Sequence, residues 1–302
     1  MMRLQPKLFG ACLLVAVGTV VGGRSHAAEP LAVNDIRGSA GERTTNFRPS
    51  PPAPRDIGAQ HPLLSVLQYA RKEQAYLRQN VHDFNCRLVK RERIDGILSD
   101  YHHVDMFVRE EVRDGNRITS PLSIYLRFVG PSSVAGRRVL YIEGQNDGKM
   151  LVRNGGRHFD YVVAQIDPEG HAAMQESLVP ITQTGLNRVL QHMVKILELH
   201  ALADPSGENT QVERIEGAKI NQRSCNVVRI LHPSKQPGLE FHVANVFIDV
   251  ELHVPMRVDF SDWPKRAGQT PPLLAEYTYT NLKLNPNLPN STFDPARLRG
   301  NR

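Results

Sequence analysis

Hydrophobic positions along the chain follow two periods, one typical of helices and one typical of strands. From Pro62 to about residue 79, apolar side chains recur every three or four residues, which predicts a helix of about 18 residues that starts at Pro62. A second helix is predicted over 184–201, with Thr182 or Thr184 as a suitable N-cap. Its apolar stripe consists of Leu186, Val189, Leu190, Met193, Ile196 and Leu197.

Elsewhere, apolar and polar residues alternate, as they do in half-buried strands. The first such stretch has apolar residues at every second position, Phe84, Cys86 and Leu88, which predicts a strand. The Asp95-Gly96 pair that follows predicts a hairpin turn. Further strands are expected at 104–112, 123–129, 139–143, 150–153, 211–216, 225–232, 241–249, 256–260 and 273–284. Because strands and helices do not alternate regularly, the pattern predicts an α+β, β-rich fold in which a strongly curved antiparallel sheet packs on two helices.

The first 27 residues have the pattern of a cleavable secretory signal. Arg3 and Lys7 precede an apolar run, and a small-residue site ends at Ala27. The run is too short to span a bilayer, and no other stretch of the chain is long and apolar enough to do so. We therefore expect a periplasmic or secreted protein after cleavage near Ala27, with no transmembrane segment in the mature chain.

The remaining chain divides by composition into three parts. Residues 28–60 are rich in Pro and Gly and predict a disordered linker. Residues 61–296 carry the helix and strand patterns and predict a single β-rich domain, followed by a short tail at 297–302. About 240 patterned residues are enough for one sizeable core.

The charge of the chain argues against a nucleic-acid partner. Removal of residues 1–27 takes away Arg3, Lys7 and Arg24 and no acidic residue, which lowers the net charge from +6 to +3. No basic run is interleaved with aromatic residues, as nucleic-acid binding would favour.

Two cysteines, Cys86 and Cys225, remain after the signal is removed. In an oxidising compartment they are candidates for a disulfide, which would stabilise the fold by about 4–5 kcal/mol for a loop of this length. The alternative is that both are buried, reduced thiols that pack as small apolar residues. The sequence leaves both possibilities open.

No motif for metal binding or catalysis is present in the sequence. The segment 143–154 has Asn154 where a calcium loop needs a bidentate Glu, so 146–148 is better interpreted as a turn. His102 and His103 are adjacent and would point to opposite faces of a strand. Neither G-x-S-x-G nor S-x-x-K occurs. We expect no metal and no cofactor, and we expect the protein not to be an enzyme; a hydrolase is the least favoured alternative.

The run Lys90-Arg91-Glu92-Arg93 has two interpretations. It could form a basic rim for an anionic headgroup, or it could be a solvated strand end that pairs with Glu110 and Glu111 across the sheet. The second interpretation is favoured.

Apolar residues on the expected strands and on the second helix are the candidate lining of a ligand cavity. They could fill the space between sheet and helices, or they could leave room for an acyl chain; periodicity alone does not decide. The candidates are Met106, Val108, Phe128, Ile142, Ile230, Ile248, Tyr277 and Met193.

Several segments together resemble a bacterial family of domains of unknown function, family 1571, which occurs in exported proteins. The resemblance covers about residues 62–294 and implies no known activity. The segments that carry it are Asn85–Arg93, Tyr141–Lys149, Leu178–Thr182, Val246–Asp249, Val254–Arg257 and Glu276–Pro286.

The layout also resembles, more remotely, the LolA/LolB-like periplasmic lipoprotein carriers. That resemblance implies a half-open β-barrel lidded by helices, whose concave face accepts an acyl chain. It rests on an N-terminal helix before a long hairpin, on a strand followed by Val254-Pro255, and on a final strand followed by Asn285-Pro286. No motif places the arginine that those carriers use, and 154–181 has no counterpart, so no ligand residue is carried over.

The sequence therefore favours a non-enzymatic carrier or sensor whose partner is a lipid, an acyl chain or a lipoprotein. The alternative is a secreted structural or interaction module with a filled core. A cavity of several hundred Å³ between sheet and helices would favour the carrier.

Overall fold

The computed structural model describes residues 61–155 and 162–299. The predicted signal peptide and linker lie outside these residues and stay predictions. The helices are α1 (Leu63–Asn80), α2 (His171–Met174) and α3 (Leu186–Ala203), with short 3-10 turns η2 (Asn146–Gly148), η3 (Ile181–Gln183), η4 (Asn290–Phe293) and η5 (Pro295–Leu298). The strands are β1 (Asp83–Ile94), β2 (Ile97–Leu98), β3 (His102–Arg109), β4 (Val112–Asp114), β5 (Arg117–Ser120), β6 (Ser123–Gly130), β7 (Arg138–Ile142), β8 (Met150–Arg153), β9 (Val163–Ile166), β10 (Gln211–Ile220), β11 (Arg223–Leu231), β12 (Val243–Asp249), β13 (Pro255–Ser261) and β14 (Leu273–Leu284).

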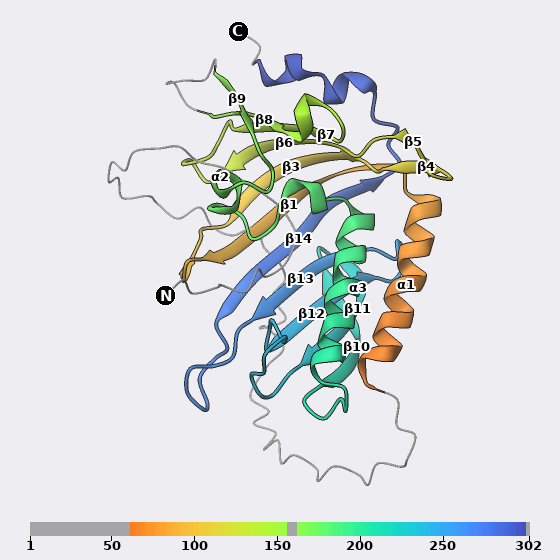
Figure 1. Cartoon of the computed structure of the whole chain (residues 1–302), viewed down its shortest axis with the longest axis vertical. Helices are drawn as coiled ribbons and strands as arrows, with labels where there is room; N and C mark the ends of the chain where they lie inside the picture. Colours follow the sequence, from red (N-terminus) through yellow and green to blue (C-terminus); the bar gives the residue numbers. More distant parts are fainter. Residues whose placement is uncertain (1–60, 156–161, 300–302) are drawn as a thin grey trace.

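One large antiparallel sheet organises the molecule (Figure 1). Its strand order is β10-β11-β12-β13-β14-β1-β3-β6-β7-β8-β9, and β2 pairs with β1 beside this path. The α+β class and the antiparallel sheet are confirmed. Strands β9 and β10 lie at opposite edges, and the described strands form no closed or strongly curled sheet.

The final strand joins the two halves of the sheet. β14 pairs with β13 on one side and with β1 on the other, so the end of the domain lies beside its beginning. In Figure 1, α1 and α3 lie side by side over the half that contains β10 to β13. An ion pair between Arg71 and Glu198 links the two helices at 2.6 Å.

The predicted strand over 104–112 ends earlier than its alternation suggests. β3 stops at Arg109, and Val112 begins β4, which pairs only with β5 in a separate two-stranded sheet with exposed side chains. The reason is Glu110, whose carboxylate is buried and reaches the start of α3. The chain therefore leaves the main sheet at this residue.

The core divides into two clusters on opposite faces of the sheet. Tyr141 belongs to the main cluster, which lies under the helices, and its neighbour Ile142 belongs to a smaller one. Neighbours on a strand point to opposite faces, so the smaller cluster lies on the other side. It contains Tyr125, Leu140, Ile142, Leu151, Phe293 and Leu298.

Cys86 and Cys225 are both buried, reduced thiols in the described chain. They lie on β1 and β11, which are four strand spacings apart in the sheet. That separation is about 19 Å, whereas a disulfide needs Cα atoms within about 7 Å. The structure therefore shows two buried, reduced thiols and no disulfide between Cys86 and Cys225.

Candidate binding site

An apolar crevice lies between the two long helices and the β10–β13 half of the sheet. Helix α1 contributes Val66 and Ala70, and α3 contributes Leu190, Met193, Ile196 and Leu197. The strands contribute Val228, Ile230, Ala244, Val246, Ile248, Pro255 and Phe260, and the segment before β12 contributes Phe241. The inward positions of α1 and α3 are apolar because both helices bury one face, as their periodicity predicts.

Three polar side chains, Tyr69, Glu73 and His253, also line the crevice. Glu73 is buried, and its carboxylate Oε2 lies 3.4 Å from Nδ1 of His253, whose side chain is about half exposed. Burial raises the pKa of Tyr69, and the nearby Glu73 charge raises it further. These residues form a small polar mouth on an otherwise apolar space.

The crevice is narrow, with a volume of about 50 Å³. That is room for a few small groups, and it is well below the several hundred Å³ typical of small-molecule sites. A long hydrocarbon chain therefore needs α1 and α3 to move away from the sheet.

The structure brings three of the eight predicted lining residues together. Met193, Ile230 and Ile248 line the crevice. The other five do not line it: Met106, Val108, Phe128 and Tyr277 are buried in the main core, and Ile142 lies in the cluster on the opposite face. Alternation shows which residues face inward, but it does not show which half of the sheet the helices cover.

Sequence reasoning missed most of the crevice lining, although a signal for part of it was present. Leu190, Ile196 and Leu197 belong to the apolar stripe of the second predicted helix, and they lie beside Met193 on the same face of α3. Val66 and Ala70 follow the helical spacing of α1 in the same way.

A second, polar cleft of about 660 Å³ lies at the other end of the helix pair. It is lined by the end of α1, the start of α3 and the residues that follow β3: Arg78, Glu110, Glu111, Val112, Arg113, Thr182, Gln183, Asn187, Arg188, Gln191, His192 and Lys195.

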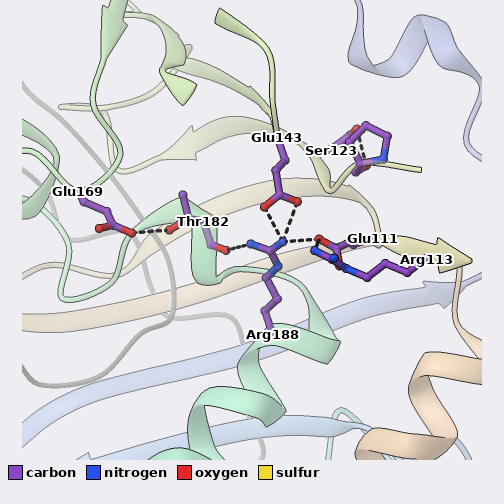
Figure 2. Close-up of polar contacts among 8 residues, drawn as sticks. Glu111, Arg113, Ser123, Glu143, Glu169, Thr182 and Arg188 are labelled. Carbon is purple, nitrogen blue, oxygen red and sulfur yellow. Dashed lines mark hydrogen bonds and ion pairs between the residues drawn. The ribbon is translucent and has the colours of Figure 1, made fainter. Parts of the chain in front are cut away.

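Arg188 lies at the centre of an ion-pair network in this region (Figure 2). Its Nη2 donates to Glu143 at 2.7 Å and to Glu111 at 2.8 Å, and its Nη1 donates to the Thr182 carbonyl at 2.8 Å. Arg113 pairs with the same Glu111, and this interaction lowers the pKa of Glu111 to about 2.

Glu110 caps helix α3 from a distant part of the chain. Its Oε1 accepts a hydrogen bond from the Leu186 amide at 2.6 Å. A Cβ on Gly185 would lie 2.9 Å from Glu110 Oε2, and Gly185 has φ +110°, so this position requires glycine. Neither Thr182 nor Thr184, the predicted N-caps, fills this role. The N-cap position of α3 is Gly185, which has no side chain, so the capping carboxylate comes from Glu110.

The favoured interpretation of Lys90-Arg91-Glu92-Arg93 as a solvated strand end is wrong for two of its residues. Lys90 and Glu92 are each 2% exposed and pair with each other at 2.6 Å. The Tyr277 hydroxyl donates to Glu92 at 2.6 Å. Both side chains point to the helix-facing side of β1, where the segment before α3 covers them; Ser177 lies 3.5 Å from Lys90 Nζ. The expected cross-strand pairing with Glu110 and Glu111 is not made.

One pair of side chains in the crevice is of a kind that hydrolases use. Glu73 and His253 bring a carboxylate and a histidine together in the crevice, as a hydrolase would need, but no Ser, Thr or Cys lies among the described residues that line it. Within residues 61–155 and 162–299, no group of three or more His, Cys, Asp or Glu side chains is placed to hold a metal ion. In the same residues, no helix combines the length and apolarity needed to cross a bilayer.

Residues 81–299 match the family described as a protein of unknown function, DUF1571. The chain belongs to this family. The match covers more than half of the sequence and begins just after α1, later than the resemblance suggested. No curated protein matches the chain at a significant level.

Several solved structures are remotely similar to the DUF1571 chain. A DUF1329 family protein from Desulfovibrio piger is 12% identical, with 79% of this chain and 100% of that chain covered and a TM-score of 0.39. A LolA superfamily protein from Nitrosomonas europaea is 9% identical, with 76% and 98% covered and a TM-score of 0.32. The lipoprotein LppX from Mycobacterium tuberculosis is 11% identical, with 75% and 98% covered and a TM-score of 0.37. At these values the similarity carries no argument about function.

Proposed function

We propose that this DUF1571 protein acts outside the cytoplasm as a non-enzymatic carrier or sensor that holds the hydrocarbon chain of a lipid or an acylated partner. The crevice between α1, α3 and the sheet is the binding site, and the two helices act as its lid. The observation that carries the proposal is the lining of the crevice, which is apolar except for Tyr69, Glu73 and His253.

An apolar space of this kind favours a hydrocarbon guest for a simple physical reason. Each buried CH₂ group contributes about 0.8 kcal/mol, and apart from Tyr69, Glu73 and His253 the lining side chains offer no hydrogen-bond partners that a polar guest would need. The polar mouth formed by Glu73 and His253 would face the headgroup end of the chain. The affinity for such a guest would depend on how many CH₂ groups it buries rather than on hydrogen bonds to particular side chains.

Entry of a long chain requires α1 and the middle of α3 to move away from the sheet, because Glu110 and the His200–His232 pair hold the two ends of α3. The ion pair of Arg71 with Glu198 is exposed, and exposed pairs contribute about 0–1 kcal/mol. Met193 is a half-buried, flexible side chain in the lining and can repack around a guest. The narrow crevice in this structure then corresponds to the closed state of the site.

A second candidate function is a structural or interaction module with a filled core. The observation that favours it is the same small volume of about 50 Å³. In that case the helices are permanently packed on the sheet, and the crevice is an ordinary packing defect.

The test is binding of a fluorescent long-chain fatty acid to the purified mature protein, with lipid extraction and mass spectrometry of the native protein alongside. Met193→Trp places a bulky side chain in the crevice and should weaken fatty-acid binding about tenfold or more. Leu199→Trp is the matched control, because Leu199 lies on α3 but is 49% exposed and points away from the crevice.

The two candidates give opposite results. A carrier binds the fatty acid, loses binding with Met193→Trp and keeps it with Leu199→Trp. A protein that yields no lipid and binds no fatty acid has the filled core of the second candidate. A protein in which Met193→Trp binds fatty acid like the wild type does not hold the chain in this crevice, and the proposed site is wrong.

A further inference from the structure

The outward surface of the helix pair has features that neither the crevice nor the core explains. Helices α1 and α3 each bury one face toward the sheet, so their other faces point together into solvent (Figure 1). His61 before α1 donates to the Asp204 carbonyl after α3 at 2.8 Å, and Arg71 pairs with Glu198 along the helices. The two outward faces therefore form one continuous surface, which we call the lid surface. Its leucines and unpaired-face cations are Leu64, Leu199, Leu202, Lys72, Arg78 and Lys195.

The lid surface is positively charged. All charged residues that α1 and α3 expose are basic, and Lys72, Arg78 and Lys195 are three of them. The two helices contain only two carboxylates. Glu73 is buried against the sheet side, and Glu198 is held in the ion pair that joins the helices. The surface therefore attracts an anionic partner over its whole length.

The same surface exposes leucines at one of its ends. Leu199 and Leu202 in the last turns of α3 are 49% and 75% exposed, and Leu64 in the first turn of α1 is 39% exposed. The bond between His61 and Asp204 brings these turns to the same end of the helix pair. Leucines that are exposed beside basic residues are typical of helices that lie in the plane of a lipid surface.

The combination of side chains favours a lipid surface over a protein partner. Protein interfaces are depleted in lysine, whereas Lys72 and Lys195 lie on the exposed face here. Anionic headgroups attract Lys and Arg from a distance, and the layer below them accepts apolar side chains. Neither α1 nor α3 is long and apolar enough to cross a bilayer, so the contact would be made at its surface.

We propose that the lid surface binds the surface of an anionic lipid bilayer. Leu199 and Leu202 enter the headgroup layer, and Lys72, Arg78 and Lys195 contact lipid phosphates. The inference rests on the proposed function only for its purpose, since a carrier of a hydrocarbon chain has to meet a membrane. Because α1 and α3 are the lid of the crevice, this contact places the moving part of the protein at the bilayer.

The first test is co-sedimentation of the purified mature protein with vesicles of mixed phosphatidylglycerol and phosphatidylcholine, and with vesicles of phosphatidylcholine alone. The wild type should bind the anionic vesicles about tenfold more tightly or better, and this binding should weaken as the salt concentration rises. Lys72→Gln/Lys195→Gln should weaken it about 25-fold, because each basic residue contributes about a factor of five. Both side chains are exposed, so the variant should keep the melting temperature of the wild type.

The matched control is Lys265→Gln/Lys283→Gln, which removes the same charge from exposed positions outside the two helices. A general attraction between a basic protein and an anionic vesicle would be reduced equally by both double variants. Contact through the lid surface predicts that the control binds within about twofold of the wild type.

A second test reports the depth of the leucines directly. Leu202→Trp keeps an apolar side chain at a position that is 75% exposed, and its fluorescence should shift to shorter wavelength when phosphatidylglycerol vesicles are added. The wild type is the control, because its single tryptophan, Trp263, lies between β13 and β14 and away from the two helices. Its fluorescence should not shift.

The proposal is overturned if the wild type binds neither kind of vesicle, or binds both equally. It is also overturned if the control loses as much affinity as Lys72→Gln/Lys195→Gln, or if the fluorescence of Leu202→Trp is unchanged on bound vesicles. Fatty-acid binding in the crevice is measured without vesicles, so the two sites can fail independently. A protein that binds fatty acid but no vesicle has the crevice without this docking surface.

Discussion

At the scale of single residues, Glu110 connects the sheet to the lid. It follows β3, is 1% exposed and caps α3 from 76 positions away in the chain. In the sequence it is one of two adjacent glutamates, and nothing in the local pattern distinguishes it from Glu111. A long-range cap depends on how strands pair, so sequence reasoning assigned the cap to the nearby threonines instead.

Burial of Glu110 raises its pKa from 4.5 to about 7. The folded protein therefore holds this proton more tightly than the unfolded chain, and the corresponding stabilisation is fully present below about pH 4.5 and is lost as the pH rises through 7. Glu110→Gln keeps an acceptor for the Leu186 amide but does not titrate. We expect the variant to avoid a loss of up to roughly 3 kcal/mol that the wild type suffers between pH 4.5 and pH 8.

The measurement is the free energy of unfolding in urea at both pH values. Glu216→Gln, which changes an exposed carboxyl on β10, serves as the control and should follow the wild type. An equal pH dependence in Glu110→Gln and the wild type would show that this carboxyl titrates normally.

At the scale of elements, a buried pair of histidines, His200 and His232, fastens the end of α3 to the segment that follows β11. The Glu240 amide donates to His200 Nε2 at 3.2 Å, so the proton of neutral His200 lies on Nδ1, 3.0 Å from His232 Nε2. His232 Nδ1 then donates to the Asn209 carbonyl at 3.1 Å. The directions of these bonds require both rings to be neutral.

Burial lowers the pKa of His200 to about 3 and also lowers that of His232. The stabilisation from a neutral pair is therefore fully present above the unfolded pKa of about 6.5 and is lost as the pH falls toward 3. His200→Leu should lower stability at pH 7 by about 2 kcal/mol, because it leaves the Glu240 amide without an acceptor. The variant should also lose less free energy of unfolding than the wild type when the pH falls from 7 to 5.

Urea unfolding at the two pH values tests this expectation. His171→Leu, on the exposed face of α2, is the control and should change neither quantity. If His200→Leu and the wild type lose stability equally on acidification, the pair does not titrate as proposed.

The helices and strands differ in how well the sequence predicts their positions. The apolar period predicts α1 within a residue at each end, because a helix that packs along its whole length carries its signal locally. β9 was missed, since its residues are mostly exposed and show no alternation of burial. The division between β3 and β4 was also missed, because the alternation of side chains continues through a point where pairing stops.

At the scale of the whole molecule, the sheet is covered on both faces by different parts of the chain. Helices α1 and α3 cover one half of one face, and the turns η4 and η5 after β14 cover the opposite face near β6, β7 and β8. The sequence indicates that strands have an inner side, but not that a short C-terminal segment buries the other side. This is why Ile142, expected in the cavity, belongs instead to the cluster that contains Phe293 and Leu298.

Phe293 is the test of this second layer. It is 5% exposed, and the Arg109 guanidinium lies 4.9 Å from the centre of its ring. Phe293→Ala should lower the free energy of unfolding by about 3 kcal/mol, because it leaves a cavity in a small cluster. It should also increase binding of a dye that reports exposed apolar surface. Urea unfolding and dye fluorescence measure the two effects, with Ser291→Ala on the same turn, which is exposed, as the control.

The position of this cluster also predicts what Phe293→Ala leaves unchanged. The crevice lies on the helix-covered face, and none of its lining residues belongs to the Phe293 cluster. At a temperature where the variant remains folded, fatty-acid binding should equal that of the wild type. A variant that is folded but binds more weakly would mean that the two faces are coupled through the sheet, and the lid could then not open independently of the C-terminal layer.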